Sequence, residues 1–231
     1  MAAAGPGGGQ ALLLFYGGTF DPVHNGHLAI ACHARDELAV PVRLMPAADP
    51  PHRPPPGANA VQRLRMLELA IAGEPGLQLD TRELQRAARQ PGVPSWSVDT
   101  LREIRTETGA TQPVALLMGA DSLLGLPTWH EWERLLDLAH IVVADRPGSV
   151  LETAMPAVLE RRLRGAWADT PASLRERAAG RVWRLRQPLQ AESATAVRRL
   201  IAGGGDWRQL LPAAVAGYVA AHGLYGGGAT T

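Results

Sequence analysis

The sequence predicts an α/β fold in which an open parallel sheet carries helices on both faces. Short apolar runs alternate along the chain with segments whose apolar residues repeat at helical spacing, which is the pattern of successive strand–helix units. The run at 114–119 is apolar on both faces, as expected of a strand buried between two helical layers. We expect right-handed crossovers between the strands and a ligand site at their carboxyl ends.

The composition fits one globular domain. The chain has 231 residues, of which 46% are hydrophobic and 19% charged, enough for one sizeable core. We expect this domain to span 11–225, between a flexible Ala/Gly-rich tail at 1–10 and a second tail at 226–231. The formal net charge of +1 gives no argument for binding nucleic acid or a membrane surface, so any anion site must be local.

Cysteine usage and the N-terminus favour a cytoplasmic protein. Cys32 is the only cysteine, which excludes a disulfide within the chain and a thiolate metal cluster and suits a reducing compartment. No apolar run approaches the length of a membrane span, and residues 1–10 lack the basic and long apolar regions of a signal peptide. The sequence leaves open whether the chain forms a homo-oligomer.

In the first half of the chain, the hydrophobic pattern predicts strands over 11–16, 42–47 and 77–80 and helices over 27–38, 60–72 and 97–109. Asn59 is a candidate N-cap for one of these helices, and Gly109 is a natural C-cap for another. The segment 47–59 is rich in proline, which lacks a backbone donor, so it predicts a stiff loop.

In the second half, the same criteria predict strands over 114–119, 140–145 and 182–185 and helices over 128–139, 193–204 and 212–225. The stretch 148–181 is rich in Arg and Ala, has helical pieces, and carries little chemical signal. These elements continue the strand–helix alternation to the end of the expected domain.

The most informative motif is FYGGTFDPVHNGHL at 15–28, between the first strand and its helix. Gly17 and Gly18 permit positive φ and a close approach of a ligand to the backbone. His24 and His27 flank the start of the helix, where free N–H groups and the helix dipole favour an anion. The imidazoles can donate hydrogen bonds to phosphate oxygens, so the motif predicts a phosphate site.

Other interpretations of this motif are weaker. Its spacing is not the G-x-G-x-x-G of a dinucleotide site, and no Gly-Lys-Ser/Thr follows as in a Walker loop. A zinc site lacks an obvious third ligand. A glycine-rich turn with incidental histidines is the plain structural alternative, and for either histidine alone it is the better one. The whole constellation in its strand–loop–helix context favours phosphate.

Further polar residues are expected at the same end of the sheet. His52 and Arg53 lie on the proline-rich loop after the second strand. Ser97 is a candidate N-cap, and Asp121 follows the strongest strand, where a carboxylate can reach a ribose hydroxyl or a metal. In ESATAVRRLI, Ser193 is positioned to cap a second helix whose first turns carry arginines, which makes a second N-terminus suited to phosphate.

Several of these motifs resemble one enzyme family. GGTFDPVHNGH resembles the signature of the nucleotidyltransferase superfamily with the T/H-x-G-H motif, and PPHR, NAVQRLRMLELAI, SWSVDTL and SATAVR resemble segments of the bacterial nicotinate-nucleotide adenylyltransferases. The resemblance implies a Rossmann-like fold of the nucleotidyltransferase type. It implies transfer of the adenylyl group of ATP to nicotinate mononucleotide, with release of pyrophosphate and with Mg²⁺ carried by ATP rather than by a fixed protein site.

The resemblance also implies roles for individual residues. His24 and His27 are the expected catalytic pair. ATP and its phosphates are expected to contact Gly17, Gly18, Thr19, Phe20, Gly26, Gly119, Asp121, Ser193, Thr195 and Arg198. Nicotinate mononucleotide is expected to contact His52, Arg53, Trp96, Ser97, Thr100 and Trp129, with the Trp129 ring stacked on the pyridine. Two positions depart from the family: Trp96 replaces a tyrosine, and Glu192 replaces an isoleucine.

Three alternatives remain at this point. One is a related transferase that uses nicotinamide mononucleotide, phosphopantetheine or a CTP-linked substrate. Another is a dinucleotide-binding protein without transferase activity, against which the missing G-x-G-x-x-G argues. The third is a metalloprotein with His24, His27 and Asp121 as ligands.

Overall fold

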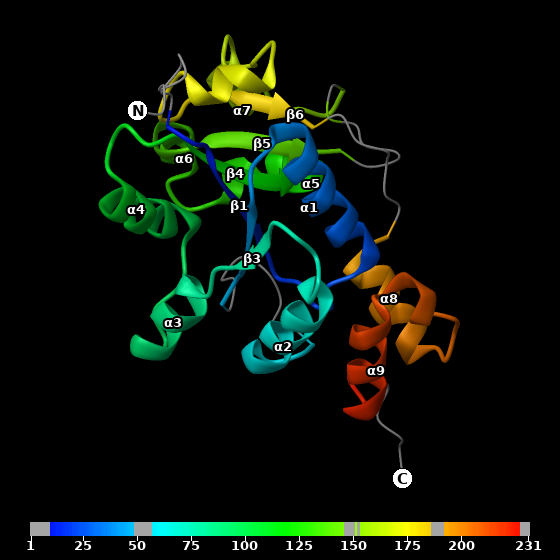
Figure 1. Ribbon diagram of the computed structural model, residues 1–231. Coiled ribbons are helices and arrows are strands. Elements are labelled where there is room, and N and C mark those ends of the chain that lie inside the picture. Colours follow the sequence, from blue (N-terminus) through cyan, green and yellow to red (C-terminus); the bar gives the residue numbers. More distant parts are fainter. Residues whose placement is uncertain (1–9, 49–56, 146–150, 152, 186–191, 227–231) are drawn as a thin grey trace, which may run out of the picture.

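A computed structural model describes residues 10–48, 57–145, 151, 153–185 and 192–226. Its centre is a six-stranded sheet in the order β3-β2-β1-β4-β5-β6, and every neighbouring pair is parallel (Figure 1). The strands are β1 (Leu13–Gly18), β2 (Val42–Pro46), β3 (Leu77–Leu79), β4 (Val114–Gly119), β5 (His140–Ala144) and β6 (Val182–Arg184). The predicted open parallel sheet and its six strand segments are confirmed.

The helices are α1 (Asn25–Leu38), α2 (Ala60–Ile71), α3 (Arg82–Arg89), α4 (Ser97–Thr108), α5 (Ala120–Leu124), α6 (Trp132–Leu138), α7 (Ala157–Leu163), α8 (Ala194–Ala202) and α9 (Ala213–Ala221). Three short 3₁₀ helices join them: η1 (Leu126–Thr128), η2 (Pro171–Arg175) and η3 (Arg208–Leu210). No helix in the described part of the chain is long and apolar enough to cross a bilayer.

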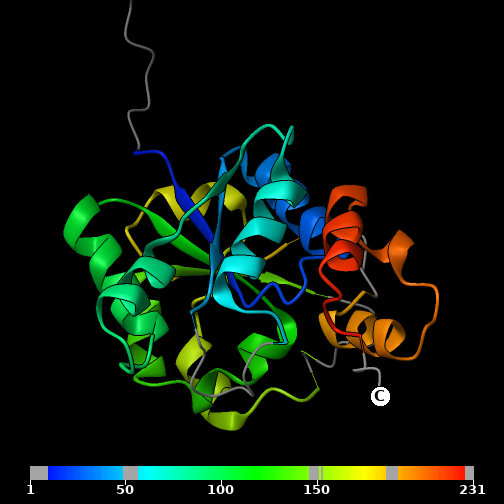
Figure 2. The same cartoon turned by 90° about the horizontal axis from the view of Figure 1, so that it is seen from below.

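Two apolar cores lie on opposite faces of the sheet, as successive residues of a strand point to opposite sides. Leu14 and Tyr16 of β1 join the core under α1, α2, α8 and α9. Phe15 joins the other core, under α4, α5, α6 and α7. Figure 2 shows the two helical layers on either side of the strands. Helices on both faces explain why β4 and β5 are apolar almost throughout.

The strand order reverses direction between β1 and β4. From β1 the chain proceeds outward to β2 and β3, then returns to place β4 on the other side of β1, with Tyr16 paired to Leu117. The carboxyl ends of β1 and β4 therefore lie side by side. In open parallel sheets, this switch point is where ligands bind.

Several helix boundaries correct the sequence predictions. The segment 128–139 is not one helix, because η1 ends at Thr128 and α6 begins at Trp132. Glu131 between them adopts a left-handed conformation with φ 46°. The N-cap of α4 is Trp96, whose side chain makes no capping bond, rather than Ser97, which is the first helical residue. The helices α3 and α5 were not predicted.

Candidate active site

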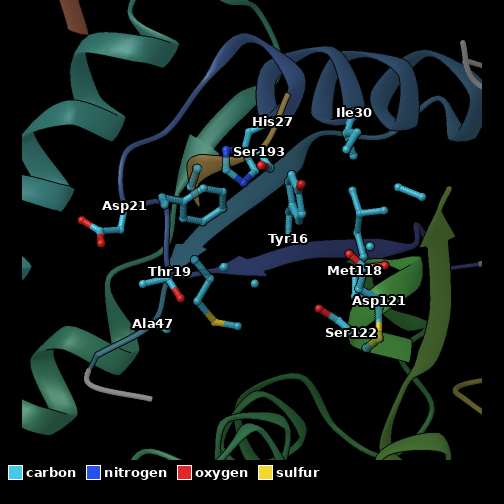
Figure 3. A pocket seen from close by; sticks show the side chains of 18 of the residues that line it. Tyr16, Thr19, Asp21, His27, Ile30, Ala47, Met118, Asp121, Ser122 and Ser193 are labelled. Carbon is cyan, nitrogen blue, oxygen red and sulfur yellow. The ribbon is translucent and has the colours of Figure 1, made fainter. Parts of the chain in front are cut away.

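A cavity of about 790 Å³ opens at the switch point. Its walls come from the β1–α1 loop, the end of β4 with the start of α5, the N-terminus of α8, and the region around α3 and α4. Figure 3 shows His27 and Ser193 on one side of this space and Asp121 and Ser122 on another. The predicted site residues that line it are Gly17, Gly18, Thr19, Phe20, His24, Gly26, His27, Ser97, Thr100, Gly119, Asp121, Trp129, Ser193, Thr195 and Arg198.

The two histidines form a fixed pair at the start of α1. His24 is the N-cap residue, with an extended backbone, and its ring stacks on that of His27 with centroids 3.7 Å apart. The His24 backbone N–H donates to Nδ1 of His27 at 3.3 Å. The ring of Phe20 meets His27 edge-on at 5.0 Å. Both imidazoles line the cavity at the N-terminus of α1, where the helix dipole favours an anion such as phosphate.

Glycine is needed in this loop for close packing rather than for positive φ. A Cβ on Gly26 would lie 3.1 Å from Nδ1 of His24 and 3.3 Å from a carboxylate oxygen of Glu192. A Cβ on Gly18 would lie 3.0 Å from the Phe20 ring. Neither Gly17 nor Gly18 has positive φ, whereas Phe20 does, at 50°. The two glycines therefore do not use the positive φ that glycine permits, and the ring of Phe20 occupies the space beside Gly18.

The second helix N-terminus, that of α8, faces the same cavity. Ser193 caps it, because its Oγ accepts from the Ala196 N–H at 3.2 Å, which confirms the predicted cap. Arg198, one turn further, reaches back toward the β1–α1 loop and donates to the Asp21 carbonyl at 2.6 Å. The N-termini of α1 and α8 thus approach one space from two separate parts of the chain.

A buried arginine joins the loops that follow β1 and β2. The Arg63 side chain on α2 is completely buried. Its guanidinium donates to the carbonyls of Thr19 at 2.9 Å, Ala47 at 2.6 Å and Ala48 at 2.9 Å. Sequence reasoning missed this residue, although a signal existed: Arg63 falls on the same helical face as Met66, three residues further along, where an apolar side chain is usual.

On the side of the cavity near α4, polar side chains form a network of hydrogen bonds. Thr100 is 1% exposed, donates to the Glu83 carboxylate at 2.7 Å, and accepts from Arg86 at 2.6 Å. The Thr100 hydroxyl is therefore engaged within the protein, although the residue lines the cavity. Burial raises the pKa of Glu83 despite the hydrogen bond from Thr100 and the charge of Arg86. No pattern in the sequence indicates Glu83, because it lies on a short polar helix, α3.

The two tryptophans expected near the pyridine ring lie in different places. Trp129 lines the cavity. Trp96 is not among the lining residues, and its ring packs against His130 with centroids 4.9 Å apart. The turn at Glu131 separates Trp129 from α6 and leaves its ring at the cavity wall. His52 and Arg53 lie outside the described residues.

The end of β4 completes the cavity. Gly119 is the N-cap of α5, and no atom lies within 4 Å of the position that its Cβ would take. Asp121 follows on α5, and its exposed side chain lines the cavity. Among the residues the structure describes, no three His, Cys, Asp or Glu side chains form a group that could hold a metal ion. The predicted alternative with His24, His27 and Asp121 as metal ligands is therefore not assembled here.

The sequence of the chain matches a known protein family. A family model described as Cytidylyltransferase-like matches residues 15–200. A Stenotrophomonas maltophilia protein named "Probable nicotinate-nucleotide adenylyltransferase" is 64% identical over 216 residues, covering 94% of this chain and 97% of the relative. A Xylella fastidiosa protein of the same name is 48% identical with the same coverage.

Solved structures show a similar fold at low sequence identity. The Plasmodium falciparum nicotinic acid mononucleotide adenylyltransferase complexed with NaAD aligns with a TM-score of 0.70 and 13% identity, covering 94% of this chain and 98% of that one. The same enzyme complexed with APC gives a TM-score of 0.68 and 12% identity with the same coverage. At this identity, the likeness supports the fold alone.

Proposed function

Since the chain belongs to the cytidylyltransferase-like family and, within it, to the nicotinate-nucleotide adenylyltransferases, we propose the following reaction for it. The enzyme transfers the adenylyl group of ATP to nicotinate mononucleotide, giving nicotinate adenine dinucleotide and pyrophosphate, a step in NAD biosynthesis. One observation carries the proposal: two helix N-termini, one with His24 and His27 and one with Ser193 and Arg198, face one cavity at the switch point.

The chemistry needs charge stabilisation more than proton transfer. The nucleophile is the phosphate of the mononucleotide, which is ionised at neutral pH and attacks the α-phosphorus of ATP as pyrophosphate leaves. Two anionic substrates must be brought together, so the site has to supply positive charge and donors. We assign His27 to the α-phosphate, His24 to an adjacent phosphate oxygen, and Arg198 to the β- and γ-phosphates.

Backbone groups complete the phosphate contacts in this proposal. The N–H groups at Gly26 and at the start of α8 point along the helix axes, where the dipoles favour an anion. Gly17 and Gly18 end β1, Thr19 and Phe20 begin the loop that carries the histidines, and Thr195 adds a hydroxyl. Gly119 leaves open space for the nucleoside, and Asp121 is assigned to a ribose hydroxyl.

We propose that Mg²⁺ enters as part of the MgATP substrate. Phosphate oxygens are hard ligands of the kind that Mg²⁺ prefers. The metal would neutralise charge on the departing pyrophosphate. The residues of this chain then position the metal-bound phosphates through hydrogen bonds.

The pyridine end of the acceptor is assigned to the wall formed by Trp129 and the start of α4. The Trp129 indole offers a flat face for the pyridine ring. Ser97, the first residue of α4, offers a backbone N–H at a helix N-terminus, which suits the nicotinate carboxylate. His52 and Arg53 remain assigned to the mononucleotide by resemblance, and Trp96 is assigned a supporting position behind this wall.

The deciding experiment measures pyrophosphate release with each combination of substrates. We expect turnover with ATP and nicotinate mononucleotide, and at least about tenfold lower kcat/KM with nicotinamide mononucleotide, because the carboxylate contact is lost. CTP in place of ATP, and phosphopantetheine in place of the mononucleotide, serve as controls for the related transferases. Release with phosphopantetheine but not with the mononucleotide would overturn the proposal.

We further propose that residues 11–225 act as one domain in the cytoplasm. The single cysteine suits a reducing compartment. Residues lining the cavity come from Tyr16 to Arg198, so a functional unit must include nearly all of that range. Fractionation of cells that express the chain at native level would test its location.

A further inference from the structure

The carboxylate of Asp21 forms a junction beside the phosphate loop. Asp21 is 4% exposed and accepts hydrogen bonds from the backbone N–H groups of Gly57 at 2.7 Å and Ala58 at 3.0 Å. The Tyr225 hydroxyl donates to the same carboxylate at 2.7 Å. Arg198 lies 3.6 Å from it as an ion pair and also donates to the Asp21 backbone carbonyl. Four segments of the chain therefore meet at one buried carboxylate.

Tyr225 is the most distant member of this junction, 204 residues from Asp21 along the chain. Its backbone is left-handed, with φ 62°, an uncommon conformation for a non-glycine residue. Its ring packs on Gly57, where a Cβ would lie 3.0 Å from two ring carbons. Burial, together with the nearby Asp21 charge, raises the pKa of the Tyr225 hydroxyl, which therefore stays protonated and donates at neutral pH.

The junction controls where Arg198 can lie. A guanidinium on a flexible side chain must be held in one orientation to bind phosphate oxygens in a defined geometry. The Arg198 side chain is 35% exposed and bonds on its inner side to Asp21. Asp21 in turn is fixed by three donors, one of which comes from Tyr225. Loss of that donor would leave Asp21, and with it Arg198, less well oriented.

We infer that Tyr225 is a positioning residue for ATP binding, and that its hydroxyl orients Arg198 through Asp21. The inference rests on the proposed function in one respect, the assignment of Arg198 to the ATP phosphates. The positioning role of the hydroxyl differs from a purely structural role for Tyr225, in which the ring alone anchors the segment after α9 to the core. The ring and the hydroxyl can be separated experimentally.

The test compares Tyr225→Phe with Tyr218→Phe. Tyr225→Phe keeps the partly buried ring and removes only the donor to Asp21. Tyr218, on α9, also packs on the same core and stacks on His222, so its substitution is a matched control outside the cavity. The Kd for MgATP is measured by calorimetry and the KM for ATP by pyrophosphate release. Urea unfolding of the same preparations separates loss of folding from loss of affinity.

We expect Tyr225→Phe to raise the Kd and KM for ATP about threefold to tenfold, the effect of losing one hydrogen bond of ordinary net strength. The kcat and the KM for nicotinate mononucleotide should stay within about twofold, and Tyr218→Phe should match the wild type. In an Arg198→Ala background, Tyr225→Phe should add no further loss of ATP affinity, because two residues acting through one contact are not additive.

An unchanged ATP affinity in Tyr225→Phe would overturn the inference. An equal loss in the wild-type and Arg198→Ala backgrounds would also overturn it, because Tyr225 would then act without Arg198. The Kd for MgATP is measured by calorimetry without nicotinate mononucleotide, so it does not depend on that substrate. If the wild type binds MgATP but releases no pyrophosphate with nicotinate mononucleotide, the proposed function fails while the effect of Tyr225 on ATP affinity is still measured.

Discussion

The imidazole rings of His24 and His27 are stacked, with their planes 29° apart, and the backbone N–H of one donates to the ring of the other. This arrangement fixes two ring faces and their nitrogens at the start of α1 before any phosphate binds. A preorganised site of this kind spends little energy on reorientation during the reaction.

His27→Ala is expected to lower kcat about 100-fold or more, as for removal of a donor to developing charge. The free energy of unfolding should fall by only about 1 kcal/mol, since one hydrogen bond from the His24 N–H is lost. Steady-state kinetics and urea unfolding check the two parts. His33→Ala, on the same helix but outside the cavity, is the control and should keep normal turnover. Near-normal kcat in His27→Ala would contradict the assignment.

Gly26→Ala should reduce activity more than stability. The new methyl group would meet the His24 ring at 3.1 Å and Glu192 at 3.3 Å, so the ring that lines the cavity must shift. We expect kcat/KM for ATP to fall at least about tenfold, in line with the sensitivity of catalysis to small displacements. Gly217→Ala is the matched control, because it lies within α9 and its Cβ would meet no atom within 4 Å.

The control has an expected result of its own. Alanine at position 217 should raise the free energy of unfolding by about 0.5–1 kcal/mol, because glycine is costly inside a helix. Kinetic constants should not change. A loss of activity in Gly217→Ala equal to that of Gly26→Ala would show that both substitutions act through the fold.

Arg63→Met should be strongly destabilising. The substitution removes the donors to three backbone carbonyls, those of Thr19, Ala47 and Ala48, of which the bond to Ala48 is fully buried. We expect the free energy of unfolding to fall by about 3 kcal/mol or more, because each carbonyl left without a donor costs about 1–3 kcal/mol. Arg65→Met, on the same helix with its side chain about half exposed, should change it by less than about 0.5 kcal/mol. Similar values for the two variants in urea unfolding would contradict this account.

His140 predicts a pH dependence of stability. Its Nε2 donates to the Arg177 carbonyl and its Nδ1 accepts from the Arg181 N–H, both at 3.0 Å, so the neutral ring is required. Burial lowers the pKa of His140 below the ordinary value of 6.5. The unfolded chain therefore takes up the proton first, and stability that is present above pH 6.5 is lost as the pH falls below it.

Urea unfolding between about pH 5 and about pH 8 measures the free energy of unfolding of the wild type and of His140→Gln. The glutamine does not titrate in that range, so the variant shows the pH dependence without His140. We expect the wild type to lose stability toward acid more steeply than the variant. Parallel curves would show that His140 does not contribute to the pH dependence.

Much of the fold could be predicted from local pattern. The strands are apolar enough to be recognised one by one, and the cap at Ser193 and the histidines at α1 depend only on neighbouring residues. The helix α3 could not be found in this way, since its buried residue is Glu83 rather than an apolar side chain. The break near Glu131 was missed because the residues on both sides of it continue a helical repeat.

Long-range contacts in the site lay beyond sequence reasoning. The residues around Asp21 in the sequence do not predict that its carboxylate bonds to Tyr225, because this contact forms through the packing of α9 on the core. The different places of Trp96 and Trp129 likewise depend on how α4 and α6 pack. Residue identity indicated the chemistry of the site, whereas the tertiary arrangement decides which of the indicated groups reach the cavity.

The division of the cavity between the two ends of the chain has a consequence for its synthesis. Translation delivers all six strands before Ser193, Arg198 and Tyr225 leave the ribosome. Domains generally begin to fold from the N-terminal side as they are made. A nascent or prematurely terminated chain that stops before residue 192 would thus contain the sheet but only one of the two helix starts that face the cavity. Truncated products would therefore bind little or no ATP, and they would not compete with the complete enzyme for this substrate.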